Sequence, residues 1–72
     1  MEESRIAKNI KQAITESGLK QYVVAERAGY STRKLSDMLN GRKIIEAVDI
    51  PKIAKVLNVT ANDLLSAERE GA

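Results

Sequence analysis

Hydrophobic residues recur at helical spacing along most of the chain. Three apolar residues follow Ile6 by four, seven and eight positions, namely Ile10, Ala13 and Ile14. This spacing places all four on one face of a helix with 3.6 residues per turn. Phenylalanine and tryptophan are absent, and β-branched residues seldom alternate with polar ones as they do in strands. The pattern therefore predicts an all-α fold.

Turn and capping residues divide this pattern into five predicted helices. Gly18, Gly29 and Gly41 each stand at the end of a segment with helical spacing, and glycine is favoured just after a helix because it adopts the left-handed conformation without a Cβ penalty. Ser31 is a good N-cap residue, and Thr60 with Asp63 forms a variant of the capping box. Four helices are predicted over residues 4–17, about 21–28, 32–39 and about 61–67. Another begins at about residue 49 and carries an apolar face that includes Leu57, and residues 42–48 form a loop or the frayed entry to it.

The length of 72 residues corresponds to one domain, which we expect to span residues 1–72 with its core over about residues 4–67 and frayed ends. A domain of this size buries only about 60% of the surface that its unfolded chain exposes, so its core must be compact. We therefore expect a compact five-helix bundle. Its core is predicted to contain Ile6, Ile10, Leu35, Met38, Ile53, Leu57 and Leu64.

The composition excludes several classes of function. The chain has no cysteine and no histidine, so it lacks disulfides, thiolate metal ligands and the commonest catalytic base. Its carboxylates show no paired or metal-like spacing, and we expect neither an enzyme nor a cofactor. The apolar runs are too short to cross a membrane, and the acidic first residues do not resemble a signal peptide. A reducing, cytoplasmic location is expected.

The net charge is only +2, but the charges are unevenly distributed. Residues 5–55 carry eleven basic and five acidic side chains, a net charge of +6, and the remaining acids lie near the two ends. A basic middle suits a protein that meets phosphate on one face. A solvated surface of mixed charge explains the same modest excess equally well.

Two short predicted helices joined by a glycine turn carry the strongest functional signal. Two helices that cross at about 90–120° need a small residue where they touch and a turn residue at ease with positive φ, and Ala25 and Gly29 meet these needs. The inward positions of the two helices are apolar: Val24, Ala28, Tyr30, Leu35 and Met38. The outward positions of the second helix are polar: Thr32, Arg33, Lys34, Ser36 and Asp37. Such a face suits the edges of bases in a DNA groove.

The run from Leu19 to Gly29 and on from Tyr30 to Gly41 resembles the helix-turn-helix domains of phage lambda-type repressors and Cro proteins, also called the Xre family. The resemblance continues through residues 53–59 and 63–65 and covers about residues 6–65. It implies a lambda-repressor-like bundle in which the second and third helices form the helix-turn-helix. The segment 31–40 is then the recognition helix, which enters the major groove.

The resemblance also implies which residues meet DNA. Base edges are read from the start of the recognition helix and from one turn later, by Ser31, Thr32, Arg33, Ser36 and Asp37. Backbone phosphates are contacted from the opening of the second helix, the flank of the recognition helix and the loop behind it, by Lys20, Gln21, Lys34, Asn40, Arg42 and Lys43. Gln21 either fastens to phosphate or supports a base-reading side chain.

Side-chain chemistry refines two of these roles. Arg33 can make a bidentate contact to guanine, which is worth about 1–3 kcal/mol of discrimination. Asp37 can accept a hydrogen bond from cytosine or hold Arg33 in place, because the two lie at the i,i+4 spacing of a salt bridge. We favour the second role, since phosphates repel a free carboxylate.

Some positions depart from the family pattern or have a simpler interpretation. The family usually caps its second helix with Ser or Thr, whereas this chain has Lys20, which can reach phosphate instead. Ile44 and Ile45 are unusually apolar for a loop and belong either to the core or to a partner surface. Tyr22 and Tyr30 are expected to pack with their hydroxyls in water rather than stack on bases. The lysines Lys8, Lys11, Lys52 and Lys55 are expected on solvated faces.

The sequence therefore predicts a sequence-specific regulator of transcription that binds double-stranded DNA, a phage or bacterial repressor. The alternative is a protein-interaction module on the same fold, such as an antitoxin or antirepressor-type partner. One recognition helix reads only a few base pairs, so we expect a homodimer, at least on DNA, and a palindromic operator. The expected dimer surface combines the exposed part of the fifth helix with residues 44–48. No small-molecule ligand is expected.

Overall fold

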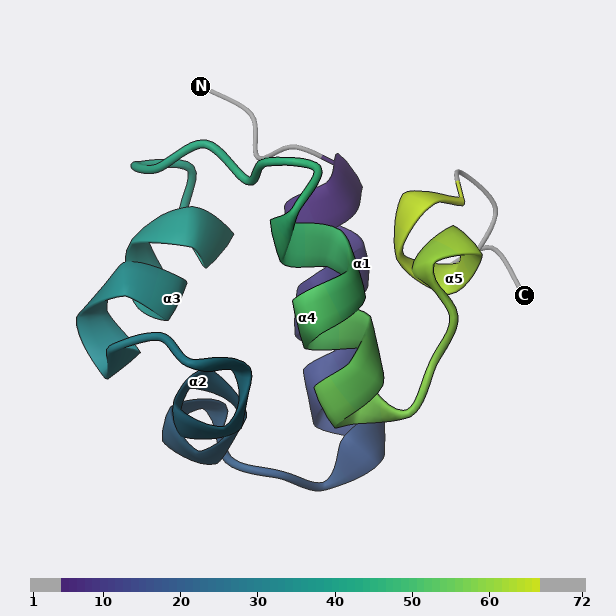
Figure 1. Cartoon of the computed structure of the whole chain (residues 1–72), viewed down its shortest axis with the longest axis horizontal. Helices are drawn as coiled ribbons and strands as arrows, with labels where there is room; N and C mark the ends of the chain where they lie inside the picture. The colour runs from purple at the N-terminus through teal and green to yellow at the C-terminus, as the bar shows by residue number, and fades with distance from the viewer. Residues whose placement is uncertain (1–4, 67–72) are drawn as a thin grey trace.

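The computed structural model describes residues 5–66 and is helical throughout apart from its turns and loops (Figure 1). Its five helices are α1 (Arg5–Ser17), α2 (Gln21–Ala28), α3 (Thr32–Leu39), α4 (Asp49–Leu57) and α5 (Ala61–Leu65). No strand occurs within residues 5–66. The all-α prediction is confirmed, and the loop predicted at residues 42–48 lies between α3 and α4.

The fifth helix is shorter than predicted. It ends at Leu65, because Ser66 has an extended backbone with φ −69° and ψ 136°. The backbone oxygen of Ser66 accepts a hydrogen bond from the buried side chain of Asn9, 2.8 Å away, which the sequence pattern gave no reason to expect. The predicted start at Ser4, the extension to Ala67 and the fraying of the chain ends lie outside the described residues.

Local hydrogen bonds explain where the helices begin and end. At the end of α2, Gly29 has φ 88°, and the backbone N–H of Tyr30 donates to the carbonyl oxygen of Ala25 at 2.8 Å. This left-handed cap satisfies a carbonyl that the helix leaves free. Thr60 and Asp63 form the predicted capping box, each side chain accepting from the other's backbone N–H at 3.0 Å. The turn and capping signals in the sequence therefore operate as expected.

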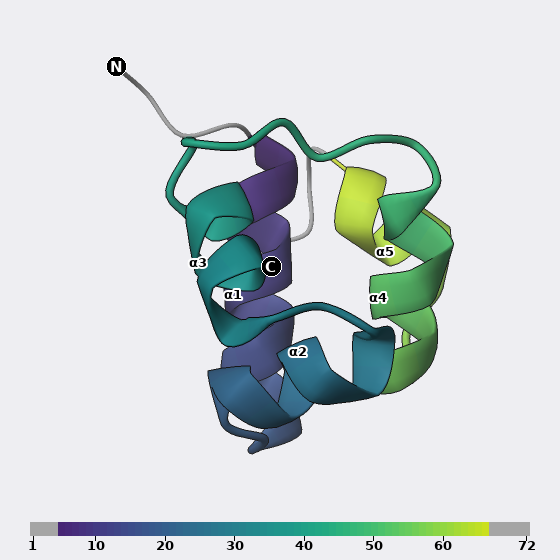
Figure 2. The ribbon, with the colours of Figure 1, turned by 60° about the vertical axis from the view of Figure 1, so that its left-hand side comes forward.

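The helices surround one hydrophobic cluster. Helix α1 packs against α3, α4 and α5, whereas α2 packs against α3 and α4. Figure 2 shows α2 running across the base of the molecule, crosswise to α4. Ala25, the predicted contact residue of α2, is fully buried. Of the seven residues predicted for the core, six are buried and Ile6 is partly buried at its edge.

One polar side chain, Asn9 on α1, is buried among these apolar residues. It is only 2% exposed, and its Nδ2 donates to the backbone oxygens of Leu64 and Ser66, both at 2.8 Å. A buried amide needs such partners because an unsatisfied polar group is costly in an apolar interior. Asn9 therefore fastens the C-terminal end of α5 to α1.

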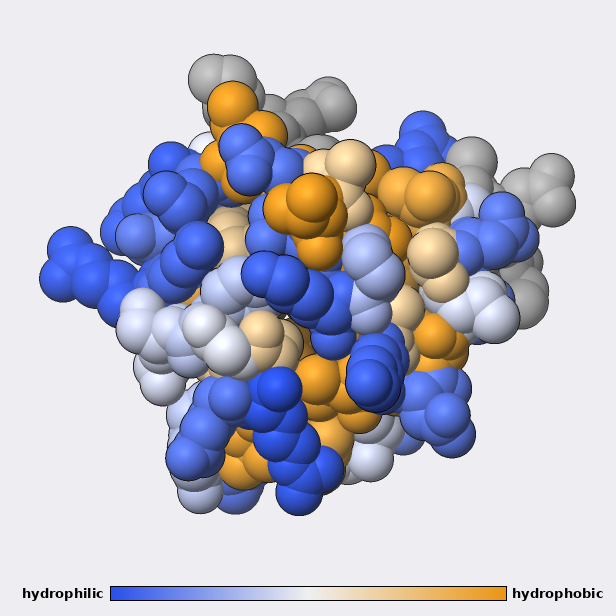
Figure 3. Space-filling view, viewed as in Figure 1, coloured by the Kyte–Doolittle hydropathy of each residue, from blue (hydrophilic) through white to orange (hydrophobic). Residues whose placement is uncertain are grey.

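The loop between α3 and α4 divides its apolar residues between core and surface. Ile45 is partly buried against the core, whereas Ile44 is 80% exposed and Val48 is 61% exposed. Leu65 of α5 is 49% exposed. In Figure 3, apolar surface breaks through the hydrophilic side chains along the upper edge, over this loop and α5. The two isoleucines therefore have different environments.

Candidate nucleic-acid interface

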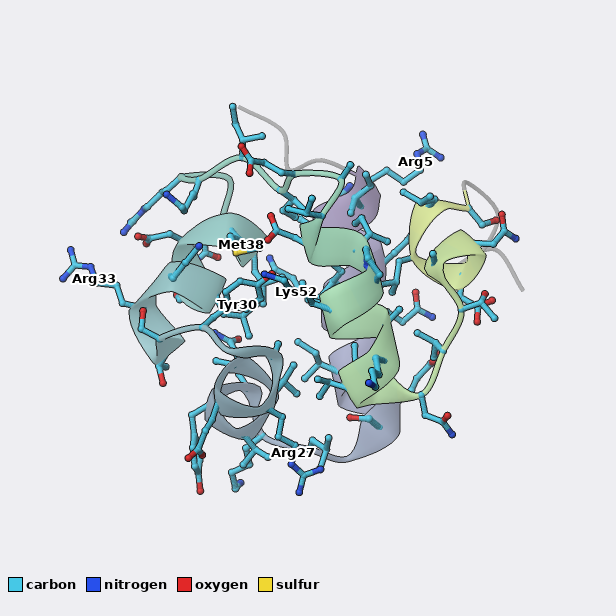
Figure 4. The ribbon with its side chains drawn as sticks, viewed as in Figure 1. Arg5, Arg27, Tyr30, Arg33, Met38 and Lys52 are labelled. Atoms are coloured by element: carbon cyan, nitrogen blue, oxygen red, sulfur yellow. The ribbon has the colours of Figure 1, made fainter. Side chains whose placement is uncertain are left out.

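The outward face of α3 is presented by the turn that joins it to α2. Gly29 reverses the chain, and Tyr30, Leu35 and Met38 are buried, so α3 is fixed to the core along one side. Thr32 and Arg33 on the other side are exposed. Arg33 extends away from the body of the molecule (Figure 4). Its guanidinium is therefore free to meet a surface from outside.

The first turn of α3 is capped by Ser31. The Ser31 hydroxyl oxygen accepts a hydrogen bond from the backbone N–H of Lys34 at 3.0 Å. Replacing a capping serine by alanine commonly costs about 1 kcal/mol. The hydroxyl still has a proton to donate to a base or phosphate, so the cap leaves room for the role predicted for Ser31.

The loop behind α3 is tied back to the end of that helix. The backbone oxygen of Asp37 accepts from the N–H groups of Arg42, at 2.8 Å, and Lys43, at 3.2 Å. Gly41 makes this tight turn possible with φ 82°. The two basic residues therefore start from fixed backbone positions, while their side chains are exposed.

Two adjoining shallow hollows lie along α3 and this loop. One is lined by Ser31, Arg33, Lys34, Asp37 and Lys43. The other is lined by Lys34, Arg42, Lys43, Ile44, Glu46 and Asp49. Together they gather four cationic and three acidic side chains beside α3, and the excess of positive charge suits contact with a polyanion. Neither hollow is lined by the remaining residues predicted to contact DNA, which are Lys20, Gln21, Thr32, Ser36 and Asn40.

The residues outside these hollows differ in how they are held. Lys20 and Gln21 are exposed at the start of α2, where Lys20 makes no side-chain cap, as expected for this departure from the family pattern. Asn40 donates from Nδ2 to the hydroxyl of Ser36 at 3.3 Å. This exposed hydrogen bond leaves the hydroxyl proton of Ser36 and the second amide proton and carbonyl oxygen of Asn40 available for contact with DNA.

The role favoured from sequence for Asp37 has no support in the geometry. Within residues 5–66, no ion pair joins Asp37 to Arg33, although the two are one helical turn apart. Exposed i,i+4 pairs contribute only about 0.3–0.5 kcal/mol, so water competes easily with such a contact. Asp37 instead lines the first hollow and supports the loop through its backbone oxygen.

A buried polar contact between Tyr30 and Asp49 was not predicted. The Tyr30 hydroxyl donates to Oδ1 of Asp49 at 2.5 Å, and Oδ2 of Asp49 accepts from the backbone N–H of Glu46 at 2.8 Å. Tyr30 is 8% exposed and Asp49 is 6% exposed. The expectation that the Tyr30 hydroxyl lies in water was wrong, because a residue 19 positions away supplies its acceptor. Tyr22, in contrast, is 55% exposed rather than packed.

Burial and hydrogen bonding shift both titrations in this pair. Burial, the hydrogen bond to Asp49 and the negative charge of Asp49 together raise the pKa of the Tyr30 phenol far above its usual value. Burial also acts to raise the pKa of Asp49, but the hydrogen bonds from Tyr30 and Glu46 and the charges of Lys34 and Lys52 outweigh it and lower that pKa. The pair is therefore a neutral phenol bound to an ionised carboxylate.

Two lysines stand over the ring of this tyrosine. The Nζ atom of Lys34 is 5.0 Å from the centre of the Tyr30 ring, and that of Lys52 is 5.8 Å from it. Figure 4 shows Lys52 reaching from α4 toward Tyr30. Lys52 is exposed, as predicted, but nothing in the sequence indicated its contact with the Tyr30 ring. This contact depends on how α3 and α4 meet.

Two further features, a metal centre and a membrane-spanning helix, have no support within residues 5–66. Residues 5–66 contain no group of three or more His, Cys, Asp or Glu side chains placed to hold a metal ion. Nor does any helix in that range have the length and apolar character needed to traverse a bilayer.

The tight turn, the polar outward face of α3 and the cations around it define a DNA-binding helix-turn-helix protein. The sequence profile of the family described as "Helix-turn-helix domain" matches residues 5–67, nearly the whole chain. The chain belongs to this family, which agrees with its resemblance to the lambda-type repressors and Cro proteins. A search of curated proteins finds no significant match. Family membership indicates a DNA-binding regulator, a role that requires no catalytic site.

Proposed function

We propose that this protein is a sequence-specific transcriptional repressor that places α3 in the major groove of double-stranded DNA. The observation that carries the proposal is the arrangement around α3, where an exposed arginine projects from the helix and basic side chains flank it. Such a repressor acts in the cytoplasm, at the nucleoid, and binds DNA without a small-molecule effector.

Reading and positioning fall to different residues. Arg33 reads a guanine from the first turn of α3, with Ser31, Thr32, Ser36 and Asp37 around it. Arg42 and Lys43 bind phosphates and add affinity without sequence information. Further contacts to the phosphates of the DNA backbone are made at the edges of the same surface by Lys20, Gln21, Lys34 and Asn40.

The protein is proposed to act as a homodimer on a palindromic operator. The half-sites would lie about one helical turn, roughly 34 Å, apart. The side chains of Ile44, Val48 and Leu65 are apolar and exposed, which supports this choice of dimer surface. Exposed apolar groups that lie together commonly mark a protein–protein contact. Sedimentation that shows a monomer both alone and on DNA would contradict the dimer.

The direct test is selection from a random duplex library at near-physiological salt, followed by sequencing. Enrichment of a short palindrome supports the proposal and delivers the operator. Binding without enrichment that collapses as salt rises leaves only attraction to the DNA backbone. That result would favour a protein-interaction module instead.

A matched pair of substitutions tests the division of roles on the selected operator. Arg33→Ala should relax the preference at one base pair of each half-site. Lys43→Ala should weaken binding to all sequences alike and lower the salt slope by about one unit. If both variants respond identically across operator variants, reading and positioning are not separate.

A further inference from the structure

The contact between Tyr30 and Asp49 joins three segments that the proposed DNA contact depends on. Tyr30 lies in the turn that leads into α3, and Asp49 is the first residue of α4. Through its second oxygen Asp49 also holds the N–H of Glu46, and the carbonyl of Glu46 accepts the N–H of Asp49 at 2.9 Å. One buried carboxylate thus fixes the turn before α3, the end of the loop and the start of α4.

The charged groups around the pair all lie beside the recognition helix. Lys34 comes from α3, Lys52 comes from α4 one turn after Asp49, and Glu46 comes from the loop. The two lysines approach the ring face of Tyr30, where a cation is attracted by the π-electrons. The same side chain of Lys34 also lines both hollows, so the pair borders the candidate interface directly.

Packing alone does not require a polar pair at this place. An apolar side chain in each position would fill the space without burying a charge, and such replacements are often neutral or stabilising elsewhere. The hydrogen bond of 2.5 Å from the Tyr30 hydroxyl to one oxygen of Asp49 is directional, whereas apolar packing is not. It restricts how α3 can rotate or slide against α4 and the loop.

We propose that Tyr30 and Asp49 form a positioning pair that sets the orientation of α3, with the basic turn bound to its end, relative to α4 and the end of the loop at Glu46. The inference rests on the proposed function, because its purpose is to let the base-reading and phosphate-binding side chains engage one duplex together. Neither residue of the pair needs to touch DNA. Their effect passes through the placement of other side chains.

The test compares Tyr30→Phe with Tyr22→Phe. Each change removes one phenolic hydroxyl, but Tyr22 is exposed and its hydroxyl has no hydrogen bond among those found within residues 5–66. Affinity is measured for the library-selected duplex and for a random duplex, at a temperature where thermal unfolding shows all proteins to be folded. Tyr30→Phe should reduce the ratio of the two affinities about tenfold, which corresponds to roughly 1.4 kcal/mol, and Tyr22→Phe should not change it.

A merely structural role makes a different prediction. If Tyr30→Phe lowers the unfolding temperature but the folded variant keeps the wild-type ratio of affinities, the positioning role is overturned. A loss of affinity shared equally by both duplexes also overturns it, because displaced reading residues must affect the selected sequence more.

A measurement without DNA separates this inference from the proposed function. Residual dipolar couplings of the free protein report the relative orientation of α3 and α4. If the library yields no preferred sequence, the proposed function fails, but the pair is still judged by these couplings. A changed orientation in Tyr30→Phe and an unchanged one in Tyr22→Phe support the pair, and unchanged orientations in both variants refute it.

Discussion

Asn9 offers the sharpest test of how the chain holds its last helix. Its side-chain amide is buried and donates 2.8 Å hydrogen bonds to the backbone oxygens of Leu64 and Ser66. Asn9→Ala removes both donors at once. The contact to Leu64 is buried, so its carbonyl loses its side-chain donor in the interior, whereas the partly buried oxygen of Ser66 can turn to water.

The expected loss of unfolding free energy is the sum of the effects on these two carbonyl oxygens. Leaving a buried acceptor unsatisfied costs about 1–3 kcal/mol, and exchanging a hydrogen bond for water costs about 1 kcal/mol. The sum, about 2–4 kcal/mol, is a large share of the stability of a domain this small, for which one core rarely supplies more than about 3–5 kcal/mol. Each kcal/mol lowers the midpoint of thermal unfolding by about 4–8 °C in this size range.

Thermal and urea unfolding followed by circular dichroism at 222 nm measure the loss. Gln12→Ala is the matched control, because Gln12 lies on the same helix and its amide donates to Glu16 at 3.1 Å on the exposed surface. The control should stay within about 0.5 kcal/mol of wild type. If Asn9→Ala is as mild as the control, the two buried hydrogen bonds do not hold α5 and the reasoning fails.

Asn9→Asp adds a check on the direction of the hydrogen bonds. An ionised carboxylate cannot donate and would face two carbonyl oxygens, so the folded state favours its protonated form and raises its pKa above the ordinary value of about 3.9. Relative to wild type, the stability of this variant should therefore be highest at acid pH and fall as the pH rises through the raised pKa. Stability that increases with pH over this range would show that the site accepts rather than donates.

Other predictions concern the core, the turn and the buried carboxylate. Leu35→Ala should cost about 2–5 kcal/mol, because Leu35 is fully buried, and should abolish DNA binding only where circular dichroism shows unfolding. Gly29→Ala should cost about 1–2 kcal/mol in urea unfolding, because φ is 88° there although no atom blocks a Cβ. The lowered pKa of Asp49 means that its carboxylate contributes stability above the usual aspartate pKa of about 3.9, and this contribution is lost as the pH falls through the lower folded value. Asp49→Asn should reduce the loss of unfolding free energy at acid pH. If the loss is as large as in wild type, other carboxylates cause it.

The sequence by itself determined most helix boundaries and the polar face of α3. Most helix starts and ends depend on neighbouring residues, such as Ser31 capping the N–H of Lys34 or Gly29 adopting a left-handed turn, so local rules place them. The end of α5 is an exception, since the extended Ser66 is bound by the distant Asn9. The periodic apolar positions also identified which face of each helix is buried. The polar face of α3 followed directly, since it is what remains when Leu35 and Met38 point inward.

Only the tertiary structure decided which distant polar groups meet. Asn9 reaches across 55 residues to Leu64, and Tyr30 reaches across 19 residues to Asp49. Periodicity classed Tyr30 as an apolar core residue and Asp49 as the start of a helix, and both descriptions hold, but neither contains the other partner. The same is true of Lys52, whose position over Tyr30 depends on the packing of α4 against the helix-turn-helix. The burial of an apolar side chain can be predicted from the spacing of apolar residues around it in the sequence. A buried hydrogen bond instead needs a donor and an acceptor at a fixed distance and direction, and only the packed helices supply that geometry.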